Sequence, residues 1–567
     1  MFSFVFPANL KEGEKIEVQL DPEDPDSTVL VCKVDETYFC VSNKCPIFGA
    51  PLSKGHLFKD KIVCPQHNTQ FSVKSGYVEG GPVFDGLQRF QITEKDGKLR
   101  IKVPKNKLNI PKNMKMVKYD INNKQKYVII GGGPAGLSAA ETLRQCGFSG
   151  KIIIVNKEKY LAYDRTVLSK NVFFSRIKDL QFRQKDFLDN YGIEILNEEE
   201  VVEINSERKF VETKNKNHIH FDKLLISSGS EPVVFECFQE LFQQNKEINN
   251  LVTLREYQDV VKIRKQILVQ NEKNKKPKIQ QKKNILIVGA SFNGMESASS
   301  IKEFLKENAN ITIIDINQQP YERLLGKEVG NAIKENFKQN GVNFLMNCTI
   351  KDFKEEDNKI QTVTLSTGEV LKPDLVLLGT GTLPNTKFVG QEVEKDEFGA
   401  IKTDSFLQSS NESIYAAGDV ACYPYHFTGE RIRSEHINSS VYQGYIAALN
   451  MYGKLTPVQQ IPFFWTGFFG KQLHYTGFVK NYDEVYIQGD LKKLEFLAWY
   501  LKNDKVLAVA SVNQGPVGIL INEAMRLNLL PSAMDIKKGR VNLDDIQKKV
   551  NEAARQCKCK RQSKCKI

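Results

Sequence analysis

The spacing of apolar residues changes near residue 105, and two kinds of structure are predicted on either side of it. Before that point, short β-type runs at residues 28–33, 37–42, 61–64 and 99–103 are separated by Gly and Pro. Such spacing predicts a small antiparallel β domain. A stretch rich in Lys, Asn and Pro follows these runs. Its composition predicts a linker.

From Tyr127 onward, the pattern is strand, glycine-rich loop, helix and strand, and it occurs twice. Apolar runs precede both loops, with residues 127–130 before 131–136 (GGGPAG) and residues 285–288 before 289–294 (GASFNG). Glycine allows a tight turn in which backbone N–H groups approach a pyrophosphate at the positive end of the next helix. The sequence therefore predicts two dinucleotide-binding units. The glycines expected at these sites are Gly131, Gly133, Gly136, Gly289 and Gly294.

The second unit begins before the first has ended, so we predict that one nucleotide-binding domain is inserted in the other. The pattern restarts at Asn284, and residues 415–420 (YAAGDV) follow far downstream. With the two loops, this motif resembles FAD- and NAD(P)-dependent reductases, in which it belongs to the first domain. That domain is therefore expected to resume near Asp374, and a β-rich segment follows from about Thr456.

The predicted fold is multidomain α/β with an additional β domain. It has an N-terminal antiparallel β domain, two Rossmann-like domains, one within the other, and a C-terminal α+β domain. The predicted divisions are the β domain at 1–105, a linker at 106–125, the first nucleotide domain at 126–283 and 374–455, the second at 284–373, the C-terminal domain at 456–545 and a basic tail at 546–567.

The composition is that of an ordinary globular protein. The 567 residues are too many for one core, and 41% are hydrophobic and 26% charged. No run approaches the roughly 20 apolar residues of a membrane span, so we expect no transmembrane segment. The N-terminus has no basic leader. We expect a cytoplasmic protein, with a mitochondrial protein as the alternative.

Much of the net charge of +12 lies in two polar stretches, residues 271–283 (NEKNKKPKIQQKK) and 557–567 (CKCKRQSKCKI). Neither stretch has aromatic residues or apolar periodicity, which predicts solvated loops or ends. A basic patch alone is weak evidence for nucleic acid, so no nucleic-acid partner is expected. An acidic redox partner would use such charge for steering.

One carboxylate stands near the end of the second strand in each nucleotide unit. Glu158 in the first unit and Asp315 in the second are placed where an acid hydrogen-bonds ribose hydroxyls. A carboxylate repels a 2′-phosphate, so Asp315 favours NADH over NADPH, although Arg323 leaves NADPH open. Either glycine loop alone also fits a simple strand-to-helix turn.

Further motifs resemble the apoptosis-inducing-factor-like and ferredoxin-reductase-like flavoproteins. Residues 161–170 (LAYDRTVLSK) resemble the PYxRPxLSK element, and residues 435–444 carry the EH and QG of the EHW…QG element. From the residues alone, the charges in these motifs are also compatible with an ordinary surface. The resemblance implies that the FAD is contacted by Arg165, Lys170, Asp419, His436 and Trp465.

The resemblance also implies that Lys170 pairs with Glu296 near the flavin. Such a pair would position the nicotinamide and tune the flavin electrostatically. The alternative is that Glu296 only stabilises the start of its helix. The nucleotide units have no paired redox cysteines, since Cys146 is alone. Dithiol chemistry is therefore not expected, and transfer from flavin to a one-electron acceptor fits better.

Two segments of the N-terminal domain resemble the cluster loops of Rieske domains. They are residues 45–52 (CPIFGAPL) and 64–67 (CPQH). The resemblance implies iron–sulfur ligands at Cys45, Cys64 and His67, but Ile47 stands where the family has its first histidine. A Rieske [2Fe–2S] centre needs two cysteines and two histidines. Three outcomes stay open, which are a fold without a cluster, a three-ligand cluster, or rescue by His56.

The resemblance to Rieske-containing, apoptosis-inducing-factor-like oxidoreductases extends from about residue 20 to about residue 520. It implies an FAD-dependent NADH oxidoreductase that passes electrons to an internal Rieske centre or to another acceptor protein, and its C-terminal domain suggests a homodimer. A second hypothesis is a non-catalytic flavoprotein kept as a structural or interaction module. The departures at Ile47, Ser227, Ser291 and Ile437 fit such drift. A third is a redox sensor whose assembly responds to NADH.

Overall fold

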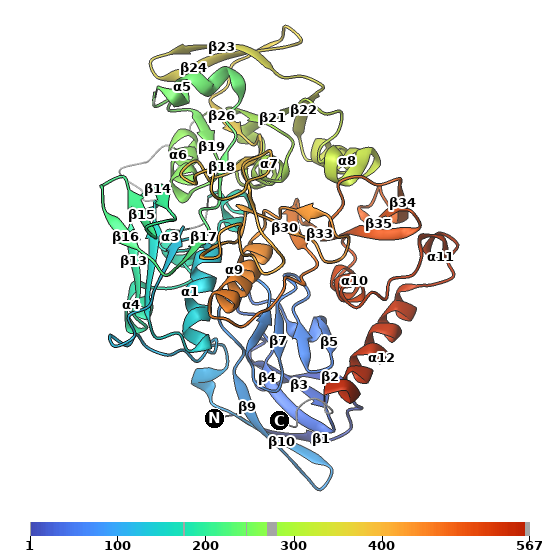
Figure 1. Cartoon of the computed structure of the whole chain (residues 1–567). Coiled ribbons are helices and arrows are strands. Elements are labelled where there is room, and N and C mark those ends of the chain that lie inside the picture. Colours follow the sequence, from blue (N-terminus) through green and yellow to red (C-terminus); the bar gives the residue numbers. More distant parts are fainter. Residues whose placement is uncertain (1, 174–175, 245, 269–280, 562–567) are drawn as a thin grey trace.

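The structure is a computed structural model that describes residues 2–173, 176–244, 246–268 and 281–561, with side chains up to residue 554. In Figure 1 the N-terminal strands lie at the bottom, the first nucleotide unit at the left, the second at the top, and the C-terminal strands and helices at the right. Most of the basic stretch 271–283 lies outside the described residues, as do the side chains of the cysteines in the basic tail.

Two antiparallel sheets form the N-terminal part and confirm the predicted β domain. In β3 (Thr28–Val34), Leu30 and Cys32 face one core and Val29 and Val31 face another, because side chains alternate along a strand. The larger sheet has the order β1 (Phe2–Pro7), β10 (Lys98–Val103), β9 (Arg89–Lys95), β4 (Thr37–Ser42), β3 and β2 (Lys15–Gln19). The smaller sheet has the order β5 (His56–Phe58), β6 (Lys61–Val63), β7 (Gln70–Ser72) and β8 (Val78–Gly80).

The first nucleotide unit is built on a parallel sheet whose last strand comes from far along the chain. Its order is β13 (Ile193–Asn197), β12 (Lys151–Asn156), β11 (Lys126–Ile130), β17 (Lys223–Ile226) and β29 (Ile414–Ala416). Helix α1 (Pro134–Cys146) connects β11 to β12 and packs against α9 (Ile437–Met451). The return of β29 beside β17 confirms that the second unit is inserted in the first.

The second parallel sheet extends beyond the boundaries predicted for it. Its order is β19 (Leu251–Thr253), β26 (Leu375–Leu378), β20 (Lys283–Val288), β21 (Ala309–Asp315) and β22 (Val342–Met346). We predicted residues 284–373 for this domain, yet β19 precedes that range and β26 follows it. A strand of three residues without a glycine loop gives too little periodicity to be recognised from sequence. The helices beside this sheet are α6 (Tyr257–Ile267), α7 (Phe292–Leu305) and α8 (Glu322–Gln339).

The C-terminal part is an antiparallel sheet followed by helices. The sheet has the order β32 (Phe463–Phe468), β33 (Lys471–Gly477), β36 (Lys505–Val512), β35 (Glu495–Lys502) and β34 (Glu484–Asp490). Its helices are α10 (Val517–Arg526), α11 (Ala533–Lys537) and α12 (Leu543–Arg561). The predicted tail at 546–567 therefore begins inside a helix, in which Ile546 and Val550 are buried. Lysines on the exposed side of α12 concealed this apolar stripe in the sequence.

Smaller elements connect these sheets. The remaining helices are α2 (Thr166–Lys170), α3 (Ile177–Leu180), α4 (Lys185–Asn190) and α5 (Gln239–Gln243). The remaining strands are β14 (Val201–Asn205), β15 (Phe210–Thr213), β16 (His218–His220), β18 (Ser230–Pro232), β23 (Ile350–Glu356), β24 (Lys359–Leu365), β25 (Val370–Leu371), β27 (Thr382–Pro384), β28 (Ile401–Lys402), β30 (Ala421–Pro424) and β31 (Arg431–Ile432).

The N-terminal domain is joined to the rest of the molecule by buried polar contacts. Arg183 pairs with Asp85 of this domain and with Glu141 of α1, at 2.7 Å in both cases. Asn68 donates to the side-chain oxygen of Asn522 in α10 at 3.0 Å. These contacts hold the loop that carries His67 against the C-terminal part.

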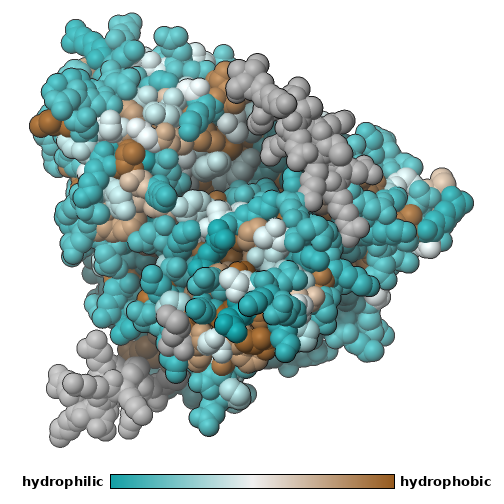
Figure 2. Space-filling view, turned by 90° about the horizontal axis from the view of Figure 1, so that it is seen from below, coloured by the Kyte–Doolittle hydropathy of each residue, from teal (hydrophilic) through white to brown (hydrophobic). Residues whose placement is uncertain are grey.

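The outer surface at this end of the molecule is mostly hydrophilic. Figure 2 looks at that face from below and shows hydrophobic residues in scattered patches among polar ones. Among the described residues, none of the helices combines the length and the apolar character that a membrane span requires.

Candidate functional site

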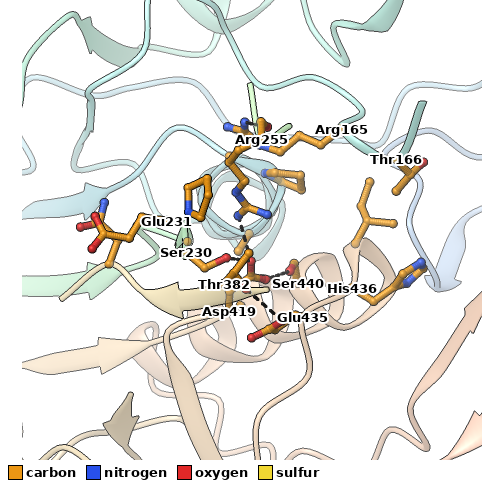
Figure 3. Close-up of a pocket in the computed structure, with 18 of the residues that line it drawn as sticks. Arg165, Thr166, Ser230, Glu231, Arg255, Thr382, Asp419, Glu435, His436 and Ser440 are labelled. Atoms are coloured by element: carbon orange, nitrogen blue, oxygen red, sulfur yellow. Dashed lines mark hydrogen bonds and ion pairs between the residues drawn. The ribbon is translucent and has the colours of Figure 1, made fainter. Parts of the chain in front are cut away.

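A long cavity of about 810 Å³ joins the two glycine loops. Residues of the first loop line one end, those of the second loop line another part, and Trp465 belongs to its wall. The cavity lies at the carboxyl ends of the parallel strands, which is where open α/β sheets bind their ligands. Its volume is within the range of small-molecule sites. Figure 3 shows part of the lining.

The first loop depends on glycine for its shape. Gly131 has a φ of 102°, and a Cβ there would lie 2.2 Å from the backbone oxygen of Ser227. Helix α1 begins after Gly133 without a side-chain cap. Its first N–H groups are therefore available to a ligand in the cavity.

Glu158 follows β12 and lines the cavity beside Arg165. Its carboxylate accepts a hydrogen bond from the Tyr163 hydroxyl at 2.8 Å and pairs with the guanidinium of Arg165. Arg165 also donates to the backbone oxygen of Arg255 at 3.0 Å. The side chain of Asn156 contacts the glycine loop and accepts from the N–H of Gly132 at 3.3 Å.

The predicted pair of Lys170 and Glu296 is present. Lys170 Nζ lies 2.9 Å from Glu296 Oε1, and Glu296 is 4% exposed. Glu296 also accepts hydrogen bonds from the hydroxyls of Ser169 and Thr466. Residues of α2, α7 and β32 therefore meet around one buried carboxylate between the two glycine loops.

Asp419 pairs with an arginine that sequence reasoning missed. Arg255 Nη2 lies 2.9 Å from Asp419 Oδ2, and the Ser230 hydroxyl donates to the same oxygen at 2.7 Å. Figure 3 shows Arg255 reaching across the cavity toward this group. The signal for Arg255 was its place after a parallel strand, where ligand-binding residues gather. That signal was hidden because β19 is so short.

His436 and Trp465 lie together at the wall shared with the N-terminal domain. The ring of Trp465 is 4.5 Å from the ring of His436 and 4.8 Å from that of His67. Burial, with the nearby charge of Lys170, lowers the pKa of His436 to about 3. Burial likewise lowers the pKa of His474, which pairs with Trp465 across the sheet, to about 4. Both rings are therefore neutral near pH 7.

Three buried polar atoms of residues that line the cavity have no partner among the described residues. They are Nε2 of His436, Nη1 of Arg433 and the hydroxyl oxygen of Tyr475. A buried polar atom without a hydrogen bond is costly, so such atoms point to a ligand or water. A cofactor with oxygen and nitrogen acceptors, such as FAD, fits this lining.

The second glycine loop differs from the first in how its helix begins. Ser291 caps α7 by accepting from the N–H of Gly294, and its hydroxyl donates to Gly379 at 2.7 Å. Asp315 accepts from the N–H of Ala290 at 2.7 Å. Gly289 has a φ of 102°, like Gly131 in the first loop. The loop thus keeps its turn while Ser291 replaces the middle glycine.

The N-terminal domain brings Cys45, Cys64 and His67 together. One ligand atom from each lies within 4.8 Å of the other two, and all three residues are buried. The Cys64 Sγ atom is 3.6 Å from Nδ1 of His67. Burial opposes ionisation of Cys64, but hydrogen bonds with Cys45 and His67 lower its pKa well below the usual value. We call these three residues the donor group.

His56 is not part of the donor group, which speaks against rescue by His56, one of the three outcomes left open by the sequence. Among the described residues, the cluster of candidate ligands contains only the three named side chains. The ring of His56 instead stacks on Phe58 at 5.4 Å, and burial lowers its pKa to about 4. His56 is the first residue of β5 and lies outside the loops that carry the donor group.

Comparisons with known proteins agree with this arrangement. The model of the family "Pyridine nucleotide-disulphide oxidoreductase" matches residues 125–444, which is more than half of the chain. The chain belongs to this family. The models "Rieske [2Fe-2S] domain" and "Reductase C-terminal" match residues 2–91 and 463–546. The first match contains both glycine loops, and the other two matches lie before and after it in the sequence.

Relatives of this family member include proteins of similar length. Apoptosis-inducing factor 3 of Mus musculus is 32% identical over 96% of this chain and 86% of its own length. A rubredoxin-NAD(+) reductase of Pseudomonas putida is 27% identical over 69% of this chain and 97% of its own. In fold, the chain resembles the covalent putidaredoxin reductase–putidaredoxin complex, with a TM-score of 0.69, 24% identity and coverage of 76% of this chain and 99% of that one.

The donor group does not fit the cluster that the domain type implies. A Rieske centre takes two cysteines on one iron and two histidines on the other. Ile47 stands in the place of the first histidine and packs against the apolar core. An aliphatic side chain has no donor atom, so one of the four ligands is missing.

Proposed function

We propose that the protein oxidises NADH and passes the electrons, through a bound FAD, to a one-electron acceptor. The observation that carries this proposal is the single cavity that joins both glycine loops and has the Lys170–Glu296 pair between them. FAD supplies the conversion of a two-electron hydride transfer into one-electron steps. The protein supplies binding, orientation and electrostatics.

The first loop and its neighbours are proposed to hold the FAD. Gly133 leaves space for the pyrophosphate at the start of α1, while Gly131 allows the tight turn and Gly136 allows the close packing of the helix on the loop. Glu158 accepts from ribose hydroxyls, while Arg165 balances its charge at 22% side-chain exposure. Further polar contacts to the cofactor are proposed for Asp419, Arg255 and His436.

The second loop is proposed to hold the NADH. Gly289 and Gly294 shape the turn, and Asp315 stands at the end of β21, where its carboxylate favours a ribose with two free hydroxyls. Its hydrogen bond with the loop N–H of Ala290 keeps the carboxylate in that place. This arrangement supports NADH over NADPH.

Lys170 and Glu296 are proposed to position the nicotinamide beside the flavin. The pair is preorganised, since Glu296 of α7 has three partners, two from α2 and one from β32. Fixed charges in a site closed to water act strongly on a reacting group and need no reorganisation. The pair therefore orients the hydride donor and tunes the acceptor at the same time.

The electron exit is proposed at the wall formed by Trp465. Two of the proteins named above are reductases of rubredoxin and putidaredoxin, which supports an acceptor of the iron–sulfur class for this chain. Trp465 lines the cavity, and its far side contacts His67. The acceptor is then either within the N-terminal domain or a separate protein.

Anaerobic titration of the purified full chain with NADH tests the proposal. We expect a visible flavin band that near-stoichiometric NADH bleaches. Lys170→Met should keep the flavin but slow the bleaching roughly 10²-fold, because one preorganised charge is removed. Lys185→Met is the matched control, since its ion pair with Asp189 is exposed. A protein that stays colourless after incubation with FAD, or equal bleaching rates in both variants, would contradict the proposal.

A further inference from the structure

The distance between Cys64 and His67 in the donor group fits two ligands of one metal ion. On a tetrahedral zinc ion, Zn–S bonds of ≈ 2.3 Å and Zn–N bonds of 2.0–2.1 Å place sulfur and nitrogen about 3.6 Å apart. The Sγ atom of Cys64 and Nδ1 of His67 are 3.6 Å apart. In a Rieske centre these two residues bind different irons, so their donor atoms lie on opposite sides of the cluster and are farther apart.

The chemistry of the donor group also selects a single ion. Two thiolates and one imidazole form a soft to borderline set, which suits zinc. Zinc sites with two cysteines, one histidine and an open fourth position are an established type. Ile47 removes the ligand that a two-iron cluster requires but leaves these three donors unchanged.

Backbone hydrogen bonds already hold the two loops of the donor group in a conformation that can bind a metal ion. The backbone N–H of Cys45 donates to Ala50 at 2.9 Å, and that of Cys64 donates to Thr69 at 2.8 Å. The His67 ring is held between Phe48 and Trp465, at 5.6 and 4.8 Å. Binding a metal therefore requires little rearrangement of the backbone.

We propose that Cys45, Cys64 and His67 bind one divalent ion of the zinc class in place of a [2Fe–2S] cluster. Zinc has no redox chemistry in proteins. The N-terminal domain then fixes its own loops through the metal, and the metal carries no electrons. The acceptor of electrons from the flavin is a separate molecule. The metal site stands on its own contacts and is independent of the flavin reaction.

Metal and sulfide analysis of the purified full chain, expressed in medium with both iron and zinc, tests the proposal. We expect one zinc per chain and no inorganic sulfide. Replacement of the zinc by Co²⁺ should give the thiolate-to-metal absorption of a tetrahedral site. Two irons with sulfide, a single iron, or a chain without metal would overturn the assignment.

Variants locate the site. Cys64→Ser and His67→Gln should each lose the zinc, whereas His56→Gln should retain it, because this half-buried histidine of the same domain lies outside the donor group. Ile47→His restores the missing ligand and should yield two irons with sulfide. Equal loss of zinc in His56→Gln would overturn the assignment of ligands. Flavin content and NADH bleaching are measured in the same samples, so failure of the metal site and failure of the proposed function are distinguishable.

Discussion

Two sites meet at Trp465, the cavity with its glycine loops and the donor group, and they have departed from their family patterns in different ways. On the cavity side, Ser227, Ser291 and Ile437 replace the usual residues, yet each has a structural role. The Ser227 hydroxyl donates to Ile130 at 3.0 Å, Ser291 caps α7, and Ile437 is the buried first residue of α9. On the other side, Ile47 alone removes a donor atom.

The difference shows which kind of position tolerates substitution. At the glycine loops, backbone N–H groups contact the ligand, so a small side chain with a favourable hydrogen bond preserves the geometry. At a metal site, each ligand is a specific side-chain atom, and no neighbour replaces it. The substitutions on the cavity side therefore give little support to the hypothesis of a non-catalytic scaffold. The substitution at Ile47, in contrast, removes one ligand from the N-terminal site.

The largest expected effect comes from loosening the contact between the N-terminal domain, which carries the donor group, and α1, which follows the first glycine loop. Arg183 is 8% exposed and links the N-terminal domain to buried Glu141 of α1. Arg183→Met should lower the free energy of unfolding by about 3–5 kcal/mol, because it leaves a buried carboxylate unpaired. Denaturant unfolding measures this loss. Arg176→Met is the control, since its pair with Asp179 is exposed to solvent and should contribute little to stability.

Acid should destabilise the region around Trp465 through its neutral histidines. Burial lowers the pKa of His474 to about 4, so the unfolded chain binds a proton between pH 6.5 and 4 that the folded chain does not. Stability therefore falls as the pH falls through this range, by roughly 3 kcal/mol for this residue at 1.36 kcal/mol per pKa unit. His474→Gln should flatten the dependence measured by denaturant unfolding. An unchanged slope in the variant would refute the assignment to His474.

The smallest effect is expected where the backbone determines the geometry. Ser227→Ala removes one hydrogen bond at the first loop and should cost about 0.5–1.5 kcal/mol while leaving FAD content unchanged. Gly131→Ala is the contrast, since its added Cβ would lie 2.2 Å from the Ser227 oxygen at a φ of 102°. That variant should lose its flavin. Equal FAD content in both variants, measured by absorbance, would contradict the view that the backbone, and not the side chain of Ser227, determines flavin binding at this loop.

Much of the architecture could be predicted from local patterns. The two glycine loops, the antiparallel N-terminal domain and the insertion of one nucleotide unit in the other all followed from residues close together in sequence, or from the order of motifs. The edges of the second unit could not be predicted. A strand as short as β19 is defined by its pairing with β26, more than a hundred residues away.

The sequence by itself determined which donors are present: two glycine loops, the acids after their strands, and a donor group with Ile47 in place of a fourth ligand. Only the tertiary structure decided which residues meet. It brought Arg255 to Asp419, and Arg183 to both Asp85 and Glu141. It also placed His67 against Trp465 and kept His56 away from the donor group. Residue types are properties of single positions, whereas contacts between distant segments depend on how whole sheets and helices pack.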